Sequence, residues 1–441
     1  MIEITAIILQ LLFFILVFSF PLNPVILNNI LKSKKYFFGV FDTLLINAVF
    51  ILNILIISSY LNFDLNILFY LLIGFSIVIN IFYLNNWSEY LVKEKISIVF
   101  FLIICVCLFF DLSNFLKFEW DGIAHWFFKT KLFYDGHTID NIKDLPAPMY
   151  PHLGPYLWAF FWKNSIVEYE YLGRLIYIFI YILSIFSMSC SIFKGKKYNN
   201  FFLLPITLFF ILLTYDEYLF GGYQEYLLFS FIALISKLIL NIIDNNSPTI
   251  KQLLILVFAG NLLIYFKDEG LIYLIIIFFI FQFFLKQKKQ KIFLISLAIV
   301  MILIQFFLEK NIIQVYGFQE SVKIDFDYIL DINFLINNSI LIFKYFLISF
   351  LKYPLWIITF LSTYILIKQK FDQKLLIHLL MIIFSILSFY FLLYIIHPYS
   401  SEFLMKVTLD RLMFQTSGFF IIYVLISFDT IYLNLNKYFK K

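Results

Sequence analysis

A short stretch between two apolar runs carries a carboxylate, an imidazole and an amine at helical spacing. Asp121 and His125 are four residues apart, which places them on one helix face, and Lys129 continues that face. Glu119 lies just before them. A carboxylate in this position can take a proton from an attacking hydroxyl group, and a nearby cation can hold a departing phosphate. The alternative is that Asp121 only caps the helix and faces water.

Two other short segments place charge at the ends of apolar runs. Glu225 follows a pair of glycines, where the backbone can turn tightly or approach a ligand closely. It can bind a ligand hydroxyl, or it can simply sit at the favourable end of a helix dipole. Lys267 and Glu269 lie between two apolar runs with almost no loop, where charge is costly unless it pairs or faces a wet cavity. We interpret Lys267 as a phosphate ligand oriented by Glu269; the alternative is a solvated turn.

Arginine occurs only at Arg174 and Arg411, and lysine supplies every other cation. Arg411 follows Asp410 just before the last apolar run, and its planar fork matches a phosphate. We therefore predict Arg411 as the main phosphate ligand, with Asp410 beside it; the alternative is an ion pair with Asp410 or another carboxylate. Arg174 either shares the phosphate or snorkels to the interface. Asp121 and His125 are a workable pair of ligands for a divalent metal, which is the alternative, but two ligands are too few and no third is identifiable, so we expect no cofactor.

The elements that position these residues are membrane helices. The chain has 441 residues, of which 63% are hydrophobic and 14% charged, with a mean hydropathy of +0.92. Soluble domains are about half apolar and a quarter charged, so the composition predicts an all-α polytopic membrane protein. The net charge of +5 follows from cytoplasmic lysines and does not indicate a nucleic-acid partner. About 13 apolar runs are near the length of a span, and they are 3–21, 37–59, 65–84, 97–112, 170–192, 200–215, 225–243, 251–267, 270–286, 292–308, 353–369, 375–396 and 413–432.

The lysine clusters orient these spans. All of them fall on one side, which is the cytoplasmic side, so the charged segments described above fall on the opposite side. The last of these segments is an outer loop expected at 397–412. Two apolar segments, 153–165 and 336–352, do not fit as spans and are interpreted as interfacial or re-entrant helices. The predicted regions are N-terminal helices 1–112, an outer loop 113–169 with an interfacial helix, central helices 170–308, a second outer loop with a helix 309–352, and C-terminal helices 353–441.

Five motifs give the chain a family resemblance. Residues 120–131 read WDGIAHWFFKTK and resemble the W-D-A-x-x-x-W-x-x-K-A-K segment of bacterial polyprenyl-phosphate-sugar glycosyltransferases. These enzymes have the GT-C fold, which includes protein mannosyltransferases and lipid A aminoarabinose transferases. Four segments then follow in the family's order: YPHLGP at 150–155, GYQEYL at 222–227, KDEG at 267–270 and LDRL at 409–412. The chain departs from the pattern at Glu225 and Asp268, where the family has Asp and Asn, and it lacks a proline after Glu225.

The resemblance implies a GT-C-like bundle in a bacterial inner membrane, with a partly helical first outer loop. It implies a sugar donor on a polyprenyl phosphate and an extracytoplasmic glycan, lipid or protein as acceptor. In this fold an acidic residue of the first outer loop is the general base of an inverting transfer, a role that falls on Asp121, with Glu119 second. Two alternatives stay open. One is an O-antigen-type polymerase or ligase, which usually depends on several outer arginines; the other is a non-enzymatic lipid transporter or flippase with charge inside its spans.

Overall fold

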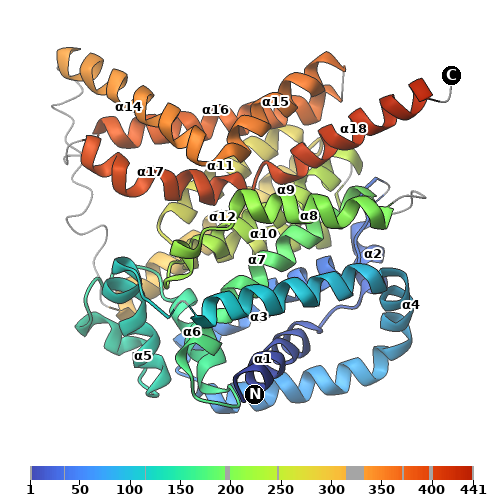
Figure 1. Ribbon diagram of the computed structural model, residues 1–441. Helices are drawn as coiled ribbons and strands as arrows, with labels where there is room; N and C mark the ends of the chain where they lie inside the picture. Colours follow the sequence, from blue (N-terminus) through green and yellow to red (C-terminus); the bar gives the residue numbers. More distant parts are fainter. Residues whose placement is uncertain are drawn as a thin grey trace.

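The computed structural model describes residues 2–33, 35–114, 116–193, 199–245, 248–313, 332–369, 372–396 and 401–439. All regular structure in these ranges is helical (Figure 1). The α-helices are α1 (Ile2–Phe18), α2 (Pro24–Leu31), α3 (Val40–Tyr60), α4 (Leu65–Asn114), α5 (Phe128–Tyr134), α6 (Leu153–Lys163), α7 (Glu170–Phe193), α8 (Asn199–Thr214), α9 (Glu225–Asn245), α10 (Ile250–Phe266), α11 (Glu269–Phe281), α12 (Lys288–Leu308), α14 (Ile332–Lys352), α15 (Pro354–Lys368), α16 (Gln373–Ile396), α17 (Ser401–Ser417) and α18 (Ile421–Phe439). Shorter π or 3-10 segments are η1 (Gly122–Phe127), η2 (Ile139–Asp144), η3 (Glu217–Phe220), η4 (Gln282–Phe284) and η5 (Glu309–Ile313).

The helices have the length and composition of membrane spans. Within the described ranges, seven are long and apolar enough to cross a membrane, or eight if α17 and α18 form one bent span. The chain is therefore an all-α, multi-pass membrane protein, as predicted. The predicted number of about 13 spans is not confirmed. Five further apolar helices have only 10–17 residues, less than a typical span of about 20 residues.

One helix replaces two of the predicted spans. The segments 65–84 and 97–112 were expected to be separate helices, but α4 runs through both as a single helix of 50 residues. The polar stretch between them contains neither glycine nor proline, so nothing in it forces the helix to end. In Figure 1 α4 curves round at the right of the view, so that its two apolar parts run back past each other.

The C-terminal region also differs from the prediction. The last outer loop was expected at 397–412 and the last span at 413–432. Instead α17 begins at Ser401, and α17 and α18 meet at a bend of 53°. Asp410 and Arg411 therefore lie inside a helix and not in a loop. Residues 397–400 and 314–331 of the two predicted outer loops lie outside the described residues.

The two predicted interfacial helices have other environments. The segment 336–352 forms most of α14, which is long and apolar enough to be a span. The segment 153–165 forms α6, which is too short to span but is packed inside the protein, with Trp158, Phe160 and Phe161 fully buried. Its aromatic side chains face neighbouring helices on all sides, which a helix lying at the membrane surface cannot do.

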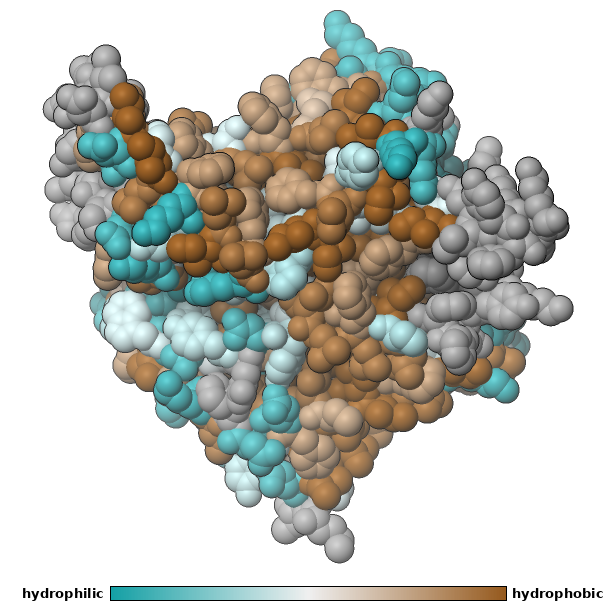
Figure 2. Space-filling model, turned by 45° about the horizontal axis from the view of Figure 1, so that its top comes forward, coloured by the Kyte–Doolittle hydropathy of each residue, from teal (hydrophilic) through white to brown (hydrophobic). Residues whose placement is uncertain are grey.

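The core lies around α7 and α9. Every residue in the 18-residue apolar windows of these two helices is buried, whereas only 17% are buried in the windows of α12 and α14. In Figure 1 the N-terminal helices α1, α3 and α4 lie below this pair and the C-terminal helices α14 to α18 lie above it. Figure 2 shows that apolar side chains cover most of the visible surface, with hydrophilic residues gathered towards its edges. This surface suits contact with lipid chains.

Candidate functional site

Arg411 lies at the centre of an ion-pair network formed by segments far apart in the sequence. Its Nη1 donates to Oδ2 of Asp121 at 2.5 Å. Its Nε and Nη2 lie 2.7 and 2.6 Å from Oε1 of Glu225. The three residues come from α17, the start of η1 and the start of α9. In this structure Arg411 forms an ion pair with carboxylates, as the alternative interpretation predicted. Its partners are Asp121 and Glu225, and not its neighbour Asp410.

Lys267 joins the same network from the turn between α10 and α11. Its Nζ lies 2.9 Å from Oε1 of Glu225 and 3.5 Å from Oε1 of Glu269. One oxygen of Glu225 thus receives contacts from two cations. The other oxygen, Oε2, is buried and has no hydrogen-bond partner among the described residues. A buried acceptor without a partner is costly, which makes Oε2 available to a donor group on a ligand. We call Asp121, Glu225, Lys267, Glu269 and Arg411 the Arg411 network.

Glycines allow the segment that carries Asp121 to approach the turn before α9 closely enough for this contact. A Cβ atom on Gly122 would lie 2.1 Å from the carbonyl oxygen of Gly221, so no larger residue fits there. The N–H of Glu119 donates to the same carbonyl at 3.0 Å. Gly222 has a φ of +104°, a conformation that favours glycine. The carboxylate of Glu119 itself pairs with Lys117 at 3.0 Å and does not join the network.

His125 flanks the network. Its Nε2 is 3.9 Å from Oδ1 of Asp121, so the predicted proximity of the two residues is present, here on a π-helical segment. The imidazole lies against the rings of Trp120 and Tyr150, with centroids 5.2 and 4.7 Å away. Burial lowers the pKa of His125, and the nearby Asp121 carboxylate offsets this only in part. Burial therefore favours the neutral form of His125 beside Asp121.

Lys129 is buried near the network but is not part of it. It is fully buried, its Nζ donates to the carbonyl oxygen of Tyr150 at 2.5 Å, and it lies 5.8 Å from the ring centroid of Trp126. Burial lowers the pKa of Lys129 to about 7, although the carboxylates of Asp268 and Glu309 favour its charged form. The amine can thus hold or release a proton near neutral pH, but it does not contact the other predicted phosphate ligands.

Arg174 and Asp410 are not brought to the network. Arg174 is fully buried, pairs with Glu170 at 2.9 Å, and donates to the carbonyl oxygen of Phe220 at 3.2 Å. It supports the turn before α9 from inside the protein, where a lipid-linked phosphate has no access. Asp410 points to α14, where it accepts hydrogen bonds from Ser349 and Lys352 at 2.5 Å each. These hydrogen bonds connect α17 to α14.

Two contributors were not among the predicted site residues. The ring of Tyr223 lies under the guanidinium of Arg411 at 4.3 Å, and its hydroxyl is 2.9 Å from that of Tyr218. Asp268 lies in the same turn as Lys267, and burial, with the nearby Glu269 and Glu309, raises its pKa to about 7. Both residues fall inside the motifs noted above. The type of Tyr223 gave no signal, because aromatic residues form 22% of the chain. Asp268 was noted only as a departure from the family motif and was not assigned to the site.

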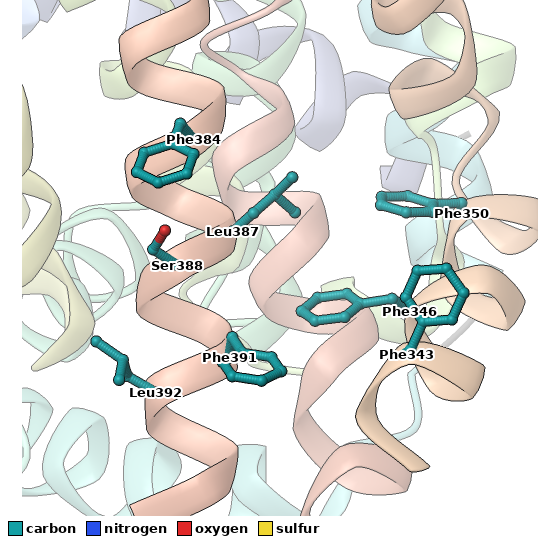
Figure 3. Close-up of a pocket in the computed structure, with 8 residues that line it drawn as sticks. All are labelled: Phe343, Phe346, Phe350, Phe384, Leu387, Ser388, Phe391 and Leu392. Atoms are coloured by element: carbon teal, nitrogen blue, oxygen red, sulfur yellow. The ribbon is translucent and has the colours of Figure 1, made fainter. Parts of the chain in front are cut away.

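An apolar groove lies between two of the C-terminal helices. It has a volume of about 540 Å³ and is formed by α14 and α16 (Figure 3). Its lining is Phe343, Phe346, Phe350, Phe384, Leu387, Ser388, Phe391 and Leu392. Ser388 supplies the one polar side chain in this lining, so the groove suits a hydrocarbon chain.

A second buried ion pair, between Asp42 and Lys237, joins α3 to α9. Lys237 donates to Oδ1 of Asp42 and, at 2.9 Å, to the carbonyl oxygen of Ser187. Oδ1 of Asp42 also accepts from the Ser187 hydroxyl at 2.6 Å, and Oδ2 accepts from the N–H of Gly39 at 3.0 Å. Lys237 is 12 residues beyond Glu225 on α9, a distance of about 18 Å along the helix. We call it the Asp42–Lys237 pair.

The Arg411 network can bind an anion and can place a carboxylate beside it. Across the described ranges no group of three or more His, Cys, Asp or Glu side chains is arranged to hold a metal ion, and Asp121 and His125 have only each other as possible ligands. The cationic Arg411 beside Asp121 also disfavours a metal at that point.

Comparisons with protein-family models, curated proteins and solved structures found no match.

Proposed function

We propose that the protein is an integral-membrane glycosyltransferase that moves a sugar from a polyprenyl-phosphate donor to an acceptor hydroxyl. The acceptor belongs to a glycan, lipid or protein outside the inner membrane. The observation that carries the proposal is the Arg411 network itself. It gathers three carboxylates and two cations from segments between residues 121 and 411, although charged residues form only 14% of the chain. Ionisable groups at membrane depth are costly, so a cluster of them is a candidate functional site.

In the proposed reaction Asp121 is the general base. It accepts the proton of the acceptor hydroxyl while the oxygen attacks the anomeric carbon and the bond to the donor phosphate breaks. The electron pair leaves on the polyprenyl phosphate, and Arg411 and Lys267 stabilise the negative charge. A direct displacement of this kind inverts the anomeric centre. The buried Oε2 of Glu225 is available for a sugar hydroxyl.

The groove between α14 and α16 supports a lipid-linked donor. Its phenylalanine lining suits a polyprenyl chain. Ser349 and Lys352 of α14 bind Asp410, the neighbour of Arg411, so the helix that forms one wall of the groove also contacts the helix that carries Arg411. The location of this network outside the cytoplasm is the one that the lysine clusters predict when α14 is not counted as a span.

The test is sugar transfer by the Asp121→Asn variant in proteoliposomes. A panel of synthetic polyprenyl-phosphate sugars serves as donor, and the release of polyprenyl phosphate and the transfer of labelled sugar are measured. We expect the variant to fold and to lose about 10²–10⁴-fold in rate, since it retains the shape but not the basicity of Asp121. Asp135→Asn is the matched control, because Asp135 pairs with Lys131 at 2.6 Å in the same loop and does not join the network. Near wild-type transfer by Asp121→Asn would reject Asp121 as the base.

A lipid transporter is the second candidate, and the Asp42–Lys237 pair is the observation that favours it. A charged pair inside the helical bundle is a feature of proteins that move a substrate through their spans. Vesicles that contain only lipid-linked substrate and no acceptor distinguish the two functions. A transporter moves the lipid across the bilayer under these conditions, whereas the proposed transferase leaves it unchanged until an acceptor is added.

A further inference from the structure

The two carboxylates that pair with Arg411, Glu225 and Asp121, differ in burial and in the number of contacts they make. Glu225 is fully buried and faces the Nε–Nη2 edge of the guanidinium. Asp121 contacts only Nη1, and 18% of its side chain is exposed. A partly exposed ion pair is weaker than a buried one and can be replaced by a better ligand from the solvent side. The Asp121 contact is therefore the one that a third anion can displace.

The contact with Arg411 also occupies the proposed base. Oδ2 of Asp121 accepts the hydrogen bond from Nη1, and this contact fixes the carboxylate against the guanidinium. His125 lies 3.9 Å from the other oxygen, Oδ1. We expect Asp121 to turn towards an acceptor hydroxyl once Arg411 gains another partner.

The other cations near Asp121 are already committed. Lys267 is divided between Glu225 and Glu269. Lys129 donates to the carbonyl of Tyr150, and Arg174 is buried against Glu170. Arg411 and Lys267 each have one partly exposed partner among the described residues, Asp121 and Glu269 respectively. Arg411 suits a phosphate better than Lys267 does, because two N–H groups of a guanidinium match two phosphate oxygens once Asp121 leaves Nη1.

We propose that the phosphate of the lipid-linked donor displaces Asp121 from Arg411, while Glu225 keeps its edge of the guanidinium, so that donor binding releases the base. This inference rests on the proposed function, and it adds an order to it: donor first, acceptor second. Once released, Asp121 takes the acceptor proton, the acceptor oxygen bonds to the anomeric carbon, and the bond from that carbon to the phosphate oxygen breaks. The electron pair leaves with the polyprenyl phosphate, which Arg411 retains.

The test measures equilibrium binding of undecaprenyl phosphate to the full-length protein in nanodiscs of neutral lipid. Because Asp121 and the phosphate compete for Arg411, Asp121→Asn should bind the probe about threefold or more tightly than the wild type. Arg411→Lys should bind it about tenfold more weakly, because a lysine cannot offer the bidentate fork. Asp135→Asn removes one carboxylate from the same loop without touching Arg411 and should bind the probe as the wild type does. Equal or weaker binding by Asp121→Asn overturns the inference.

Two further arms make the result specific. Asp121→Ser is measured beside Asp121→Asn, so that a folding defect in one variant does not decide the outcome. Only a variant that elutes as a single symmetrical peak in size-exclusion chromatography is used to judge the inference. Phosphatidic acid replaces undecaprenyl phosphate in the second arm, and tighter binding of phosphatidic acid alone overturns the inference in favour of a membrane phospholipid. The assay involves no sugar transfer. If Asp121→Asn binds undecaprenyl phosphate more tightly but wild-type protein transfers no sugar, the proposed function fails and the anion exchange at Arg411 stands.

Discussion

The protein contains two charged clusters on α9, and they differ in how completely their polar atoms are satisfied. In the Asp42–Lys237 pair, both oxygens of Asp42 accept hydrogen bonds, and Lys237 has a second acceptor and the ring of Phe38 at 4.6 Å. In the Arg411 network, Oε2 of Glu225 has no partner within the described ranges, and Asp121 and Arg411 retain 18% and 15% exposure. The two clusters contain similar residue types, but the polar atoms of the first are satisfied and not all of those of the second are.

The difference separates a structural ion pair from a binding site. A buried polar network that is fully satisfied fixes the position of its helices and has no capacity for another ligand. A network with an unpartnered buried atom and an exposed edge carries a cost that a ligand can remove. We therefore assign the Asp42–Lys237 pair to the packing of α3, α7 and α9, and the Arg411 network to chemistry.

Glu225→Gln should break the Arg411 network with the largest effect on stability. It leaves Arg411 and Lys267 beside each other without the fully buried carboxylate that they share. Removal of one partner from a buried ion network typically costs about 3–5 kcal/mol. Denaturant unfolding in detergent micelles measures this loss. Sugar transfer should fall as well, because Arg411 loses the contact that holds its guanidinium in place.

A second substitution shows whether stability and function separate in this network. Glu225→Gln combined with Lys267→Met removes one of the two uncompensated cations and should recover part of the lost stability, with no recovery of sugar transfer. Recovery of both properties would mean that the network is structural, as the Asp42–Lys237 pair is.

Lys237→Met should cost somewhat less, about 3 kcal/mol, because Asp42 keeps its hydrogen bonds from Ser187 and Gly39. The double variant Asp42→Asn with Lys237→Met leaves no buried charge and should be more stable than Lys237→Met alone. A double-mutant cycle on denaturant unfolding gives the coupling between the two residues. Sugar transfer per folded molecule should match the wild type in both variants. A selective loss of transfer would show that this pair takes part in substrate passage and would favour the transporter.

The class of protein could be predicted from the sequence, but the number and ends of the helices could not. Hydropathy indicates which segments avoid water, and on that basis the all-α membrane class is confirmed. It does not indicate where a helix stops in a polar stretch that lacks glycine and proline, so α4 was predicted as two helices. It also placed Arg411 in a loop, because charged residues lower the hydropathy of α17 without ending the helix.

The residues of the Arg411 network were all among the predicted site residues, and the sequence indicated them because charge is scarce. It could not indicate which charges pair. Arg411 was expected beside Asp410, its neighbour in the chain, but helical geometry turns the two side chains apart, and Asp410 binds α14 instead. Arg174 resembles Arg411 in sequence context, and only packing shows that it is enclosed. Pairing of this kind depends on tertiary contacts between segments far apart in the chain.

Asp268 tests whether the carboxylates beside Lys267 behave as a site. Burial and the neighbouring Glu269 and Glu309 raise the pKa of Asp268 to about 7, whereas an unfolded chain has a pKa of about 3.9. Between these values the folded state binds the extra proton, so stability falls as the pH rises from about 4 to 7. Asp268→Asn does not titrate and should lack this part of the loss. The melting temperature of the wild type minus that of Asp268→Asn should therefore decrease from pH 4 to pH 7 and then level off. A difference that does not change with pH would show that Asp268 is ionised throughout and faces water, as a solvated turn would require.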